Sequence, residues 1–290
     1  MKRSHRLIRQ AMQELQEATR PKLSEVTGLS LVSVNKAVAE LSNTGELLHC
    51  SLIPSGGGRP VQLYRYNSRH GQHALIQISN KNSTWIGKME LLDLQGVPQQ
   101  QFEGRFAYID TESFDGWLDE ATAKQKLSSI TLYFGGESTN TTLAEHLKAR
   151  YHCPVRTPST ASVLAPRTDG YVSICFPIGQ AITCAMFRGE HMHECGPLEL
   201  LPLPVRWQEL DHSDHTLKEE TVARLLQIIS CTLAPQCIYL HTPAWSSRLM
   251  ERIRYNAQTK MRGALPPIRF LPLTEAALRQ ALYRYAATIH

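Results

Sequence analysis

Long apolar runs are absent from the 290-residue sequence, and no stretch approaches the about 18 consecutive apolar residues that a membrane-spanning helix needs. The basic start, residues 1–6, is not followed by the apolar segment of a secretory signal, because Arg9, Gln10 and Gln13 interrupt it. Paired cysteines are absent too: the seven cysteines are scattered without a Cys-x-x-Cys motif, so we expect reduced thiols and no disulfide framework. These absences indicate a cytoplasmic protein with no membrane partner.

Most of the chain has no excess of either positive or negative residues. Of the 31 Lys and Arg and the 26 Asp and Glu, ten and five lie in residues 1–70, which leaves 21 of each for residues 71–290. The whole net charge of +5 therefore belongs to the first quarter of the chain. A small basic segment beside a neutral domain is typical of proteins that bind the phosphates of nucleic acids, although a solvated basic surface is the alternative.

The sequence of the basic segment predicts three short helices at its start. Apolar residues recur with helical periodicity from Leu7 to Leu15, and a second helix is predicted over 22–27. It ends at Gly28, which can adopt the left-handed conformation of a tight turn between helices. Ser30 follows as the predicted N-terminal cap of a third helix.

The third predicted helix has two different faces. An apolar stripe at spacings of three and four is expected to pack inward, and it consists of Leu31, Val34, Val38 and Leu41. The opposite face and its flank carry small or polar side chains suited to the major groove of DNA, namely Val32, Ser33, Asn35 and Lys36. Asn35 can pair with adenine and Lys36 can bind guanine or a phosphate. Val32 can contact a thymine methyl group, and Ser33 can bond a base or a phosphate.

Two predicted strands, 47–53 and 60–66, follow the helices and are joined by a glycine-rich segment with one basic residue, Arg59. A hairpin of this kind can approach the DNA backbone or a narrow minor groove. The sequence therefore predicts a winged helix-turn-helix that binds double-stranded DNA. Its candidate contact residues are Lys22, Val32, Ser33, Asn35, Lys36 and Arg59. The alternatives are a structural core whose hairpin contacts nothing, or a module that docks another protein.

This segment resembles that of a known family, the ROK group of repressors and sugar kinases, and in particular its N-acetylglucosamine-repressor type. Residues 23–30 are similar to the second helix and turn of that group, residues 34–41 to its recognition helix, and Gly57-Gly58-Arg59-Pro60 to its wing. The resemblance continues more weakly over the remaining chain. It divides the protein into a winged helix-turn-helix domain, residues 1–70, and a sugar-kinase-like domain, residues 71–290.

Residues 71–290 alternate between strand-like and helix-like patterns, which predicts an α/β domain. The expected strands are 75–78, 85–94, 130–134, a short one around Val155, 171–176, 181–187 and 237–240. Gly96 is expected in a turn, and 171–187 is expected to form a hairpin. The expected helices are 143–151, 221–232, 247–259 and 273–286. The resemblance implies two actin-like, ribonuclease-H-like lobes around a cleft.

The positions where ROK kinases carry their chemistry hold other residues here. The phosphate loop of the family would fall on residues 78–83, which contain no glycine, so backbone donors could not approach a triphosphate closely. The catalytic Glu-Asn-Asp run falls on Arg156-Thr157-Pro158, and proline cannot act as a general base. The family usually has a second glycine pair after the buried strand that residues 237–240 match, and His241-Thr242 stand in its place here. We expect no catalytic residue, no enzyme activity and no cofactor.

One carboxylate of the family's sugar site is matched. Residues 193–197 are similar to its Gly-Glu-x-Gly-His stretch and keep Glu194, whereas Pro197 replaces the histidine that binds sugar and zinc. The family's three-cysteine zinc cluster has no counterpart in residues 207–216. A solvated loop glutamate is the alternative interpretation of Glu194. The candidate effector cleft consists of Gly135, Gly136, Glu137, Thr157 and Glu194.

A different metal site is conceivable in the same stretch. His191, His193 and Cys195 would share one face of a strand, and histidine and cysteine are zinc ligands. However, Gly189 and Gly196 on the two sides favour a loop, in which histidines more often bond backbone or water. We therefore expect no metal.

These observations favour a sequence-specific transcriptional regulator, expected to be a repressor. A homodimer or higher homo-oligomer is expected, because one helix in one groove rarely supplies enough affinity. The large domain would then hold the subunits together and sense a sugar-derived ligand or a protein partner. The alternatives from other functional classes are a protein-interaction scaffold and an atypical sugar kinase.

Overall fold

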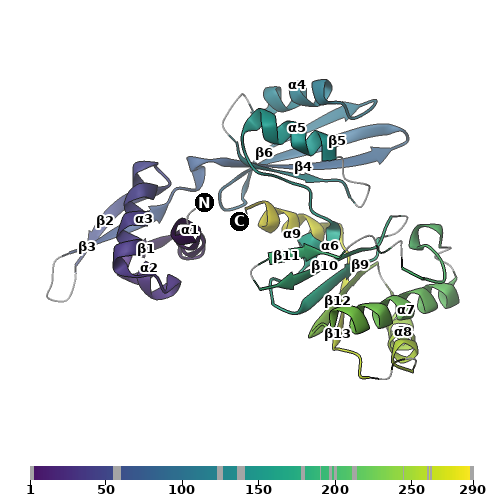
Figure 1. Cartoon of the computed structure of the whole chain (residues 1–290). Helices are drawn as coiled ribbons and strands as arrows, with labels where there is room; N and C mark the ends of the chain where they lie inside the picture. The colour runs from purple at the N-terminus through teal and green to yellow at the C-terminus, as the bar shows by residue number, and fades with distance from the viewer. Residues whose placement is uncertain are drawn as a thin grey trace.

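The structure is a computed structural model, and it describes residues 3–54, 60–122, 127–135, 141–177, 180–189, 191–195, 198, 201–210, 214–243, 245–259, 261 and 263–287. A small N-terminal module lies beside a larger two-lobed part, and each lobe contains one five-stranded sheet (Figure 1). In the part of the chain so described, no helix is long and apolar enough to span a membrane.

The N-terminal module consists of three helices and a small sheet. Its elements are α1 (Arg3–Leu15), β1 (Glu17–Thr19), α2 (Arg20–Thr27), α3 (Leu31–Asn43), β2 (Leu47–Ile53) and β3 (Val61–Tyr66). The three strands are antiparallel in the order β1-β3-β2. The predicted helices and both hairpin strands are present, but β1 was not predicted from the sequence. The module's core includes Leu94 of the larger part, so the two parts are packed together.

The first lobe contains a sheet with the order β6-β5-β4-β7-β8. After a short 3-10 helix (Ser68–His70) come β4 (Gln72–Lys81), β5 (Thr84–Asp93), β6 (Pro98–Phe106), α4 (Thr111–Thr122), β7 (Leu127–Tyr133), α5 (Thr141–Tyr151) and β8 (Val155–Arg156). Helices α4 and α5 cover one face of this sheet through a core that includes Phe114, Leu118 and Leu147. Neither β6 nor α4 was predicted from the sequence. Most residues of β6 are exposed, which leaves a weak strand pattern, whereas α4 buries Phe114, Leu118 and Ala121 at helical spacing, a signal that was overlooked.

The second lobe contains a sheet with the order β11-β10-β9-β12-β13. Its elements are α6 (Thr160–Leu164), β9 (Tyr171–Cys175), β10 (Thr183–Arg188), β11 (His191–Glu194), a 3-10 helix (Trp207–Glu209), α7 (His215–Leu233), β12 (Cys237–Thr242), α8 (Ser247–Thr259) and β13 (Ile268–Pro272). Strands β9, β10 and β11 are antiparallel neighbours, and β12 is parallel to both β9 and β13. Helices α7 and α8 pack on one face of this sheet.

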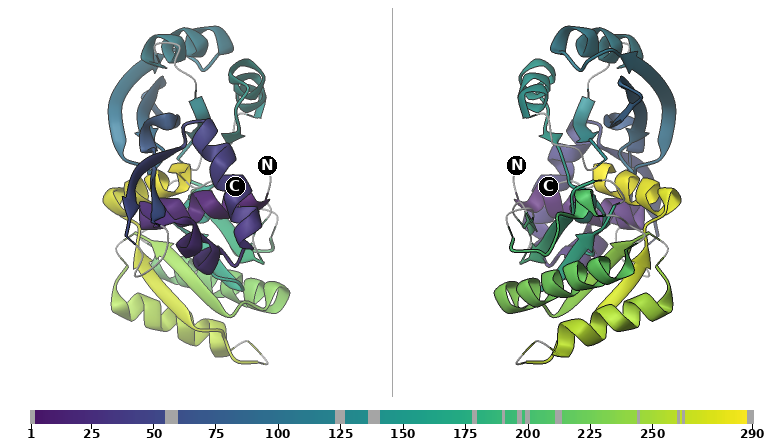
Figure 2. Two further views of the ribbon diagram at one scale, coloured as in Figure 1. Left: turned by 90° about the vertical axis from the view of Figure 1, so that its left-hand side faces the viewer. Right: turned by 90° about the vertical axis from the view of Figure 1, so that its right-hand side faces the viewer.

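The last helix, α9 (Glu275–Ala287), returns to the first lobe after β13. Ala281, Leu282 and Ala286 pack with Leu75 and Leu92 on the sheet face opposite α4 and α5. Figures 1 and 2 show α9 between the two sheets, close to the N-terminal module. The helix therefore contacts a lobe that the chain had left more than a hundred residues earlier.

Two expectations from the sequence are wrong. Leu31 was expected in the buried stripe of α3, but it is 50% exposed, and the buried stripe is Val34, Ala37, Val38 and Leu41. Leu31 is the first residue of the helix, where no neighbouring element covers it. Residues 191–194 were expected in a loop but form β11, because they pair with β10 as its antiparallel neighbour.

Candidate DNA-contacting surface

Local hydrogen bonds fix the turn between α2 and α3. Gly28 ends α2 in the left-handed conformation at φ 67°, and its N–H donates to the carbonyl oxygen of Ser24 at 3.0 Å. The Ser24 hydroxyl donates to the carbonyl oxygen of Leu29 at 2.6 Å. Ser30 caps α3 by accepting the N–H of Ser33. The predicted turn glycine and cap are thus confirmed, and they set the angle at which α3 leaves the turn.

The outer face of α3 is open to solvent. Val32 is 78% exposed, and Asn35 and Lys36 are exposed beside it. Ser33 is half-buried, and its hydroxyl lies 3.0 Å from that of Ser30. Three of the four predicted groove-facing side chains are therefore available to a ligand, whereas Ser33 also takes part in the helix cap.

A groove of about 570 Å³ separates the start of α2 and α3 from the β2–β3 hairpin. Asn35 lines one side and Pro60 the other; the remaining lining residues are Arg20, Pro21, Leu31, Leu52, Val61 and Gln62. The groove is open to solvent and combines apolar walls with an arginine and two amides. Arg59, the predicted wing residue, and the adjoining glycines lie outside the described residues.

Arg20 is a groove residue that the sequence analysis missed. Its guanidinium lies over the ring of Tyr64, 5.2 Å from the ring centroid, which holds the cation at the groove. The signal available in the sequence was its place at the first turn of α2, after the capping residue Thr19. Lys22, which was predicted, is exposed on α2 and forms an ion pair with Glu25 at 3.1 Å.

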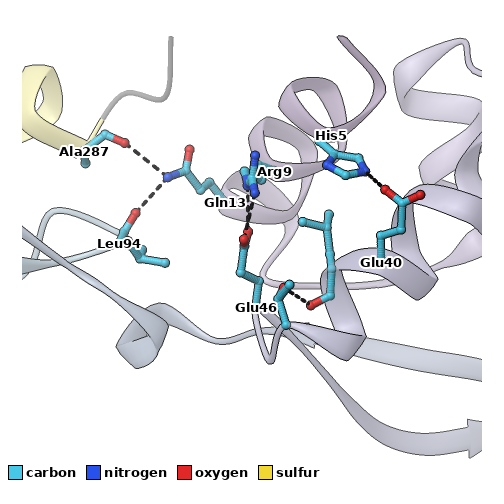
Figure 3. A network of polar contacts seen from close by, with 9 residues as sticks. His5, Arg9, Gln13, Glu40, Glu46, Leu94 and Ala287 are labelled. Carbon is cyan, nitrogen blue, oxygen red and sulfur yellow. Dashed lines mark hydrogen bonds and ion pairs between the residues drawn. The ribbon is translucent and has the colours of Figure 1, made fainter. Parts of the chain in front are cut away.

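Helix α1 contacts both α3 and the larger part of the protein (Figure 3). His5 pairs with Glu40 of α3 at 2.8 Å, and Arg9 pairs with Glu46 just beyond α3 at 2.6 Å. Gln13 donates its side-chain N–H groups to two carbonyl oxygens of the larger part, those of Leu94 at 2.7 Å and Ala287 at 3.2 Å. Because α1 makes these contacts, the exposed residues of α3 and the hairpin are not used for attachment.

The positions that match the kinase machinery serve other purposes. Residues 78–83, where the family's phosphate loop would fall, are the end of β4 and a two-residue turn in which Asn82 and Ser83 have φ of 51° and 62°. Arg156 of β8 donates to the carbonyl oxygens of Tyr285 at 3.2 Å and Ala286 at 2.7 Å, at the end of α9. A cation at the C-terminal end of a helix stabilises its unsatisfied carbonyls. Pro158 is buried.

The candidate effector residues are only partly brought together. Glu194 accepts hydrogen bonds from the Ser159 hydroxyl at 2.5 Å and the Ser159 N–H at 3.2 Å. Ser159 follows Thr157 by two positions in the chain, so Glu194 contacts the segment that carries Thr157. Gly135 has a φ of +63° and faces Gln180. Gly136 and Glu137 lie outside the described residues, as do Gly196 and Pro197. Among the described residues, no group of three or more His, Cys, Asp or Glu side chains is placed to hold a metal ion.

Comparison with known proteins agrees with this architecture. No family model and no curated protein matches the amino-acid sequence. A solved structure of a ROK family transcriptional regulator, described as a homolog of the E. coli MLC protein, matches 98% of this chain and 96% of its own with a TM-score of 0.65 at 13% identity. At this identity the match bears on the fold alone, and it confirms the mixed α/β, two-lobed architecture that the sequence resemblance implied for the larger part.

Two sugar-kinase structures match less well. A protein of Listeria monocytogenes described as a candidate N-acetylmannosamine kinase covers 73% of this chain and 98% of its own at 12% identity, with a TM-score of 0.48. A candidate N-acetylglucosamine kinase of Porphyromonas gingivalis covers the same shares, 73% and 98%, at 12% identity with a TM-score of 0.38. These scores are too low to bear on the function of this chain.

Proposed function

We propose that this protein is a ROK-type transcriptional regulator whose N-terminal module, residues 1–70, is a winged helix-turn-helix that binds double-stranded DNA. The observation that carries the proposal is the solvent-exposed face of α3, with Val32, Asn35 and Lys36, which lies beside a groove and a hairpin. An α-helix fits the major groove of B-DNA, and the hairpin would then contact the adjacent backbone. The concentration of the net positive charge in this module supports the same proposal.

The binding mode follows from the attachment through α1. The module presents α3 and its hairpin on the side turned away from the two lobes (Figure 1; Figure 2, left, is the view from that side). Two such modules in a homodimer would reach two half-sites about one helical turn of DNA apart, roughly 34 Å. We propose that the larger part, residues 71–290, holds the subunits together and acts in repression.

Selection of bound genomic fragments tests the proposal. The full chain is incubated with sheared genomic DNA, bound fragments are recovered and sequenced, and a recovered fragment is titrated by fluorescence anisotropy at several salt concentrations. We expect a recurring, partly palindromic site whose affinity falls steeply with salt, because protein cations displace counterions from the phosphates. Recovery of fragments without any common sequence, with the same affinity for unrelated DNA, would contradict the proposal.

For the larger part, we propose a non-catalytic effector role around Thr157 and Glu194. Glu194 is exposed and its neighbour Ser159 supplies a second polar group, which suits a small polyhydroxylated ligand such as a sugar derivative. The sugar-kinase alternative conflicts with Pro158 at the position of the general base. Incubation with ATP and a panel of hexoses and amino sugars separates the two, since phosphate transfer to any of them would refute the non-catalytic role.

A further inference from the structure

Two cysteines of the second lobe face each other across neighbouring strands. The pairing of β10 with β11 continues beyond its last strand residue, since the N–H of Cys195 donates to the carbonyl oxygen of Cys184 at 2.8 Å. Ala185 is paired with Glu194, so Cys184 and Cys195 are the next opposed residues. Opposed residues of an antiparallel pair point to the same side of a sheet.

Their packing confirms that both thiols are on one face. Cys184 is 2% exposed within the core beneath α7, and Cys195 packs against the same core from its edge. Cys175 lies on the neighbouring strand β9 but belongs to the cluster on the opposite face, with Ala161 and Ala185. Cys184 therefore has one cysteine partner within reach among the described residues of this sheet, and it is Cys195.

The separation of the two residues suits a disulfide. Opposed residues that exchange a backbone hydrogen bond have Cα atoms about 5.5 Å apart. A disulfide spans Cα separations of roughly 4.4–6.8 Å. Cys195 lies one residue beyond β11, and its backbone N–H still donates to β10.

We propose that Cys184 and Cys195 form a redox-active thiol pair, which hydrogen peroxide converts into an intramolecular disulfide between β10 and the end of β11. This inference is independent of the proposed DNA binding. Interaction between the two thiols lowers the pKa of the more accessible one, Cys195, and together with burial it raises the pKa of Cys184.

The chemistry then follows in two steps. The Cys195 thiolate attacks one oxygen of the peroxide, the O–O bond breaks, and a sulfenic acid and hydroxide form; the proton lost by Cys195 converts the hydroxide into water. The Cys184 sulfur then attacks the sulfenic sulfur, and the disulfide forms as a second water leaves. Two electrons pass from the thiols to the peroxide, which is reduced to two molecules of water.

The disulfide would fix a strand end that also carries Glu194. This carboxylate accepts two hydrogen bonds from Ser159, the capping residue of α6. Closing the Cys184–Cys195 bond therefore restrains β10, β11 and the start of α6 as one unit. The thiol pair is placed to stiffen the edge of the second lobe in response to oxidation.

The test uses the full chain, reduced and then treated with a small molar excess of hydrogen peroxide. After alkylation of the remaining thiols, we expect the number of free thiols to fall from seven to five, and peptide mapping to find the Cys184–Cys195 disulfide. Treatment with dithiothreitol should restore seven. The Cys231→Ser variant, which lacks an exposed cysteine of α7, is the matched control and should form the same disulfide.

Two further variants separate the roles. In Cys184→Ser protein the sulfenic acid at Cys195 should persist and be trapped by dimedone, and in Cys195→Ser protein Cys184 should stay reduced. Peptide mapping of the oxidised wild-type protein tests the proposed disulfide even if a variant does not fold. Oxidation of the exposed Cys50 or Cys231 while Cys184 and Cys195 remain reduced would overturn the inference.

Discussion

Arg9 and Glu46 form a two-point ion pair between α1 and the segment that follows α3. The Arg9 Nε lies 2.6 Å from Glu46 Oε2 and its Nη2 lies 2.7 Å from Oε1, so both ends of the carboxylate are engaged (Figure 3). The hydrogen bond to Glu46 is the main reason that the pKa of Arg9 is raised. Both side chains are largely shielded, 17% and 14% exposed, so screening by solvent is weak. The pair therefore fixes the position of α3 against α1.

Removal of one partner should destabilise the module measurably. We expect Arg9→Ala to lower the free energy of unfolding by about 2 kcal/mol, because Glu46 is left partly buried without its cation. Urea denaturation followed by circular dichroism measures the change. The control is Glu25→Ala, which breaks the exposed pair with Lys22 and should cost at most about 0.5 kcal/mol. Equal losses in the two variants would contradict the structural role assigned to Arg9.

Gly96 occupies a turn that touches the end of α9. Its φ is +80°, and a Cβ there would lie 3.0 Å from both the Ala287 Cβ and the Tyr283 carbonyl oxygen. We expect Gly96→Ala to cost about 2–3 kcal/mol, since the strained conformation and the displaced helix end add together. Gly189→Ala is matched in φ, at +62°, but meets no atom within 4 Å, and should cost about 1 kcal/mol. Thermal unfolding of the two variants makes the comparison, and a Gly96 variant no less stable than the Gly189 variant would refute the contact with α9.

The sequence predicted local features well and distant contacts poorly. The left-handed Gly28, the Ser30 cap and the bounds of α8 depend on neighbouring residues, and all three are confirmed. Strands β1 and β13 were missed because three- and five-residue strands exist only through their partners. The use of Arg156 to bind the end of α9 could not be predicted, since its acceptor lies 130 residues away in the chain.

The same distinction applies to the candidate site. Helical periodicity placed Val32, Asn35 and Lys36 on an exposed face, and the structure puts them there. Periodicity also placed Leu31 inside, because a pattern cannot show which turn of a helix extends beyond its neighbours. Arg20 joins the groove only when the hairpin brings Tyr64 beneath its guanidinium, so its place at the first turn of α2 was not enough to identify it.

Gln13 links the N-terminal module to the larger part through two main-chain carbonyls. In Gln13→Glu protein the donor is replaced by a carboxylate that faces the carbonyl oxygens of Leu94 and Ala287, so both hydrogen bonds are lost and replaced by repulsion. We expect faster hydrogen exchange of the Leu94 amide, which donates to Ser68 across the same junction. Glu14→Gln alters the neighbouring exposed residue of α1 and should leave this exchange rate unchanged.

Lys36 and Asn35 should affect DNA binding in different ways. Lys36→Ala should weaken binding similarly for all sequences and reduce the slope of log affinity against log salt by about 1 if the lysine contacts a phosphate. Asn35→Ala should reduce discrimination between the selected site and a site with one substituted base pair by about 1–3 kcal/mol. Lys88→Ala, an exposed lysine of β5 in the larger part, is the matched control and should bind as the wild type does. Identical binding by all four proteins would refute the assignment of α3 to DNA.

Acid should destabilise the larger part through two buried histidines. His73 and His241 are 5% and 4% exposed, and burial is the main cause that lowers the pKa of each from 6.5 to about 4. Arg156 contributes to the shift of His73, whose Nδ1 lies 2.7 Å from the Ser129 hydroxyl. Between pH 6.5 and about 4 the unfolded chain therefore binds protons that the folded chain does not.

The sign of the effect follows from this difference in bound protons. The stabilisation is fully present above pH 6.5 and is lost as the pH falls towards about 4, by at most about 3 kcal/mol for each histidine. Urea unfolding of the wild type and of the double variant His73→Asn/His241→Asn is measured at several pH values between about 7.5 and 4.5. The quantity compared is the change in unfolding free energy with pH, not its absolute value. We expect a shallower dependence in the double variant, whereas His191→Asn, which alters an exposed ring of β11, should keep the wild-type slope. If the double variant and the wild type lose stability in parallel, carboxylates rather than these two imidazoles control the acid response.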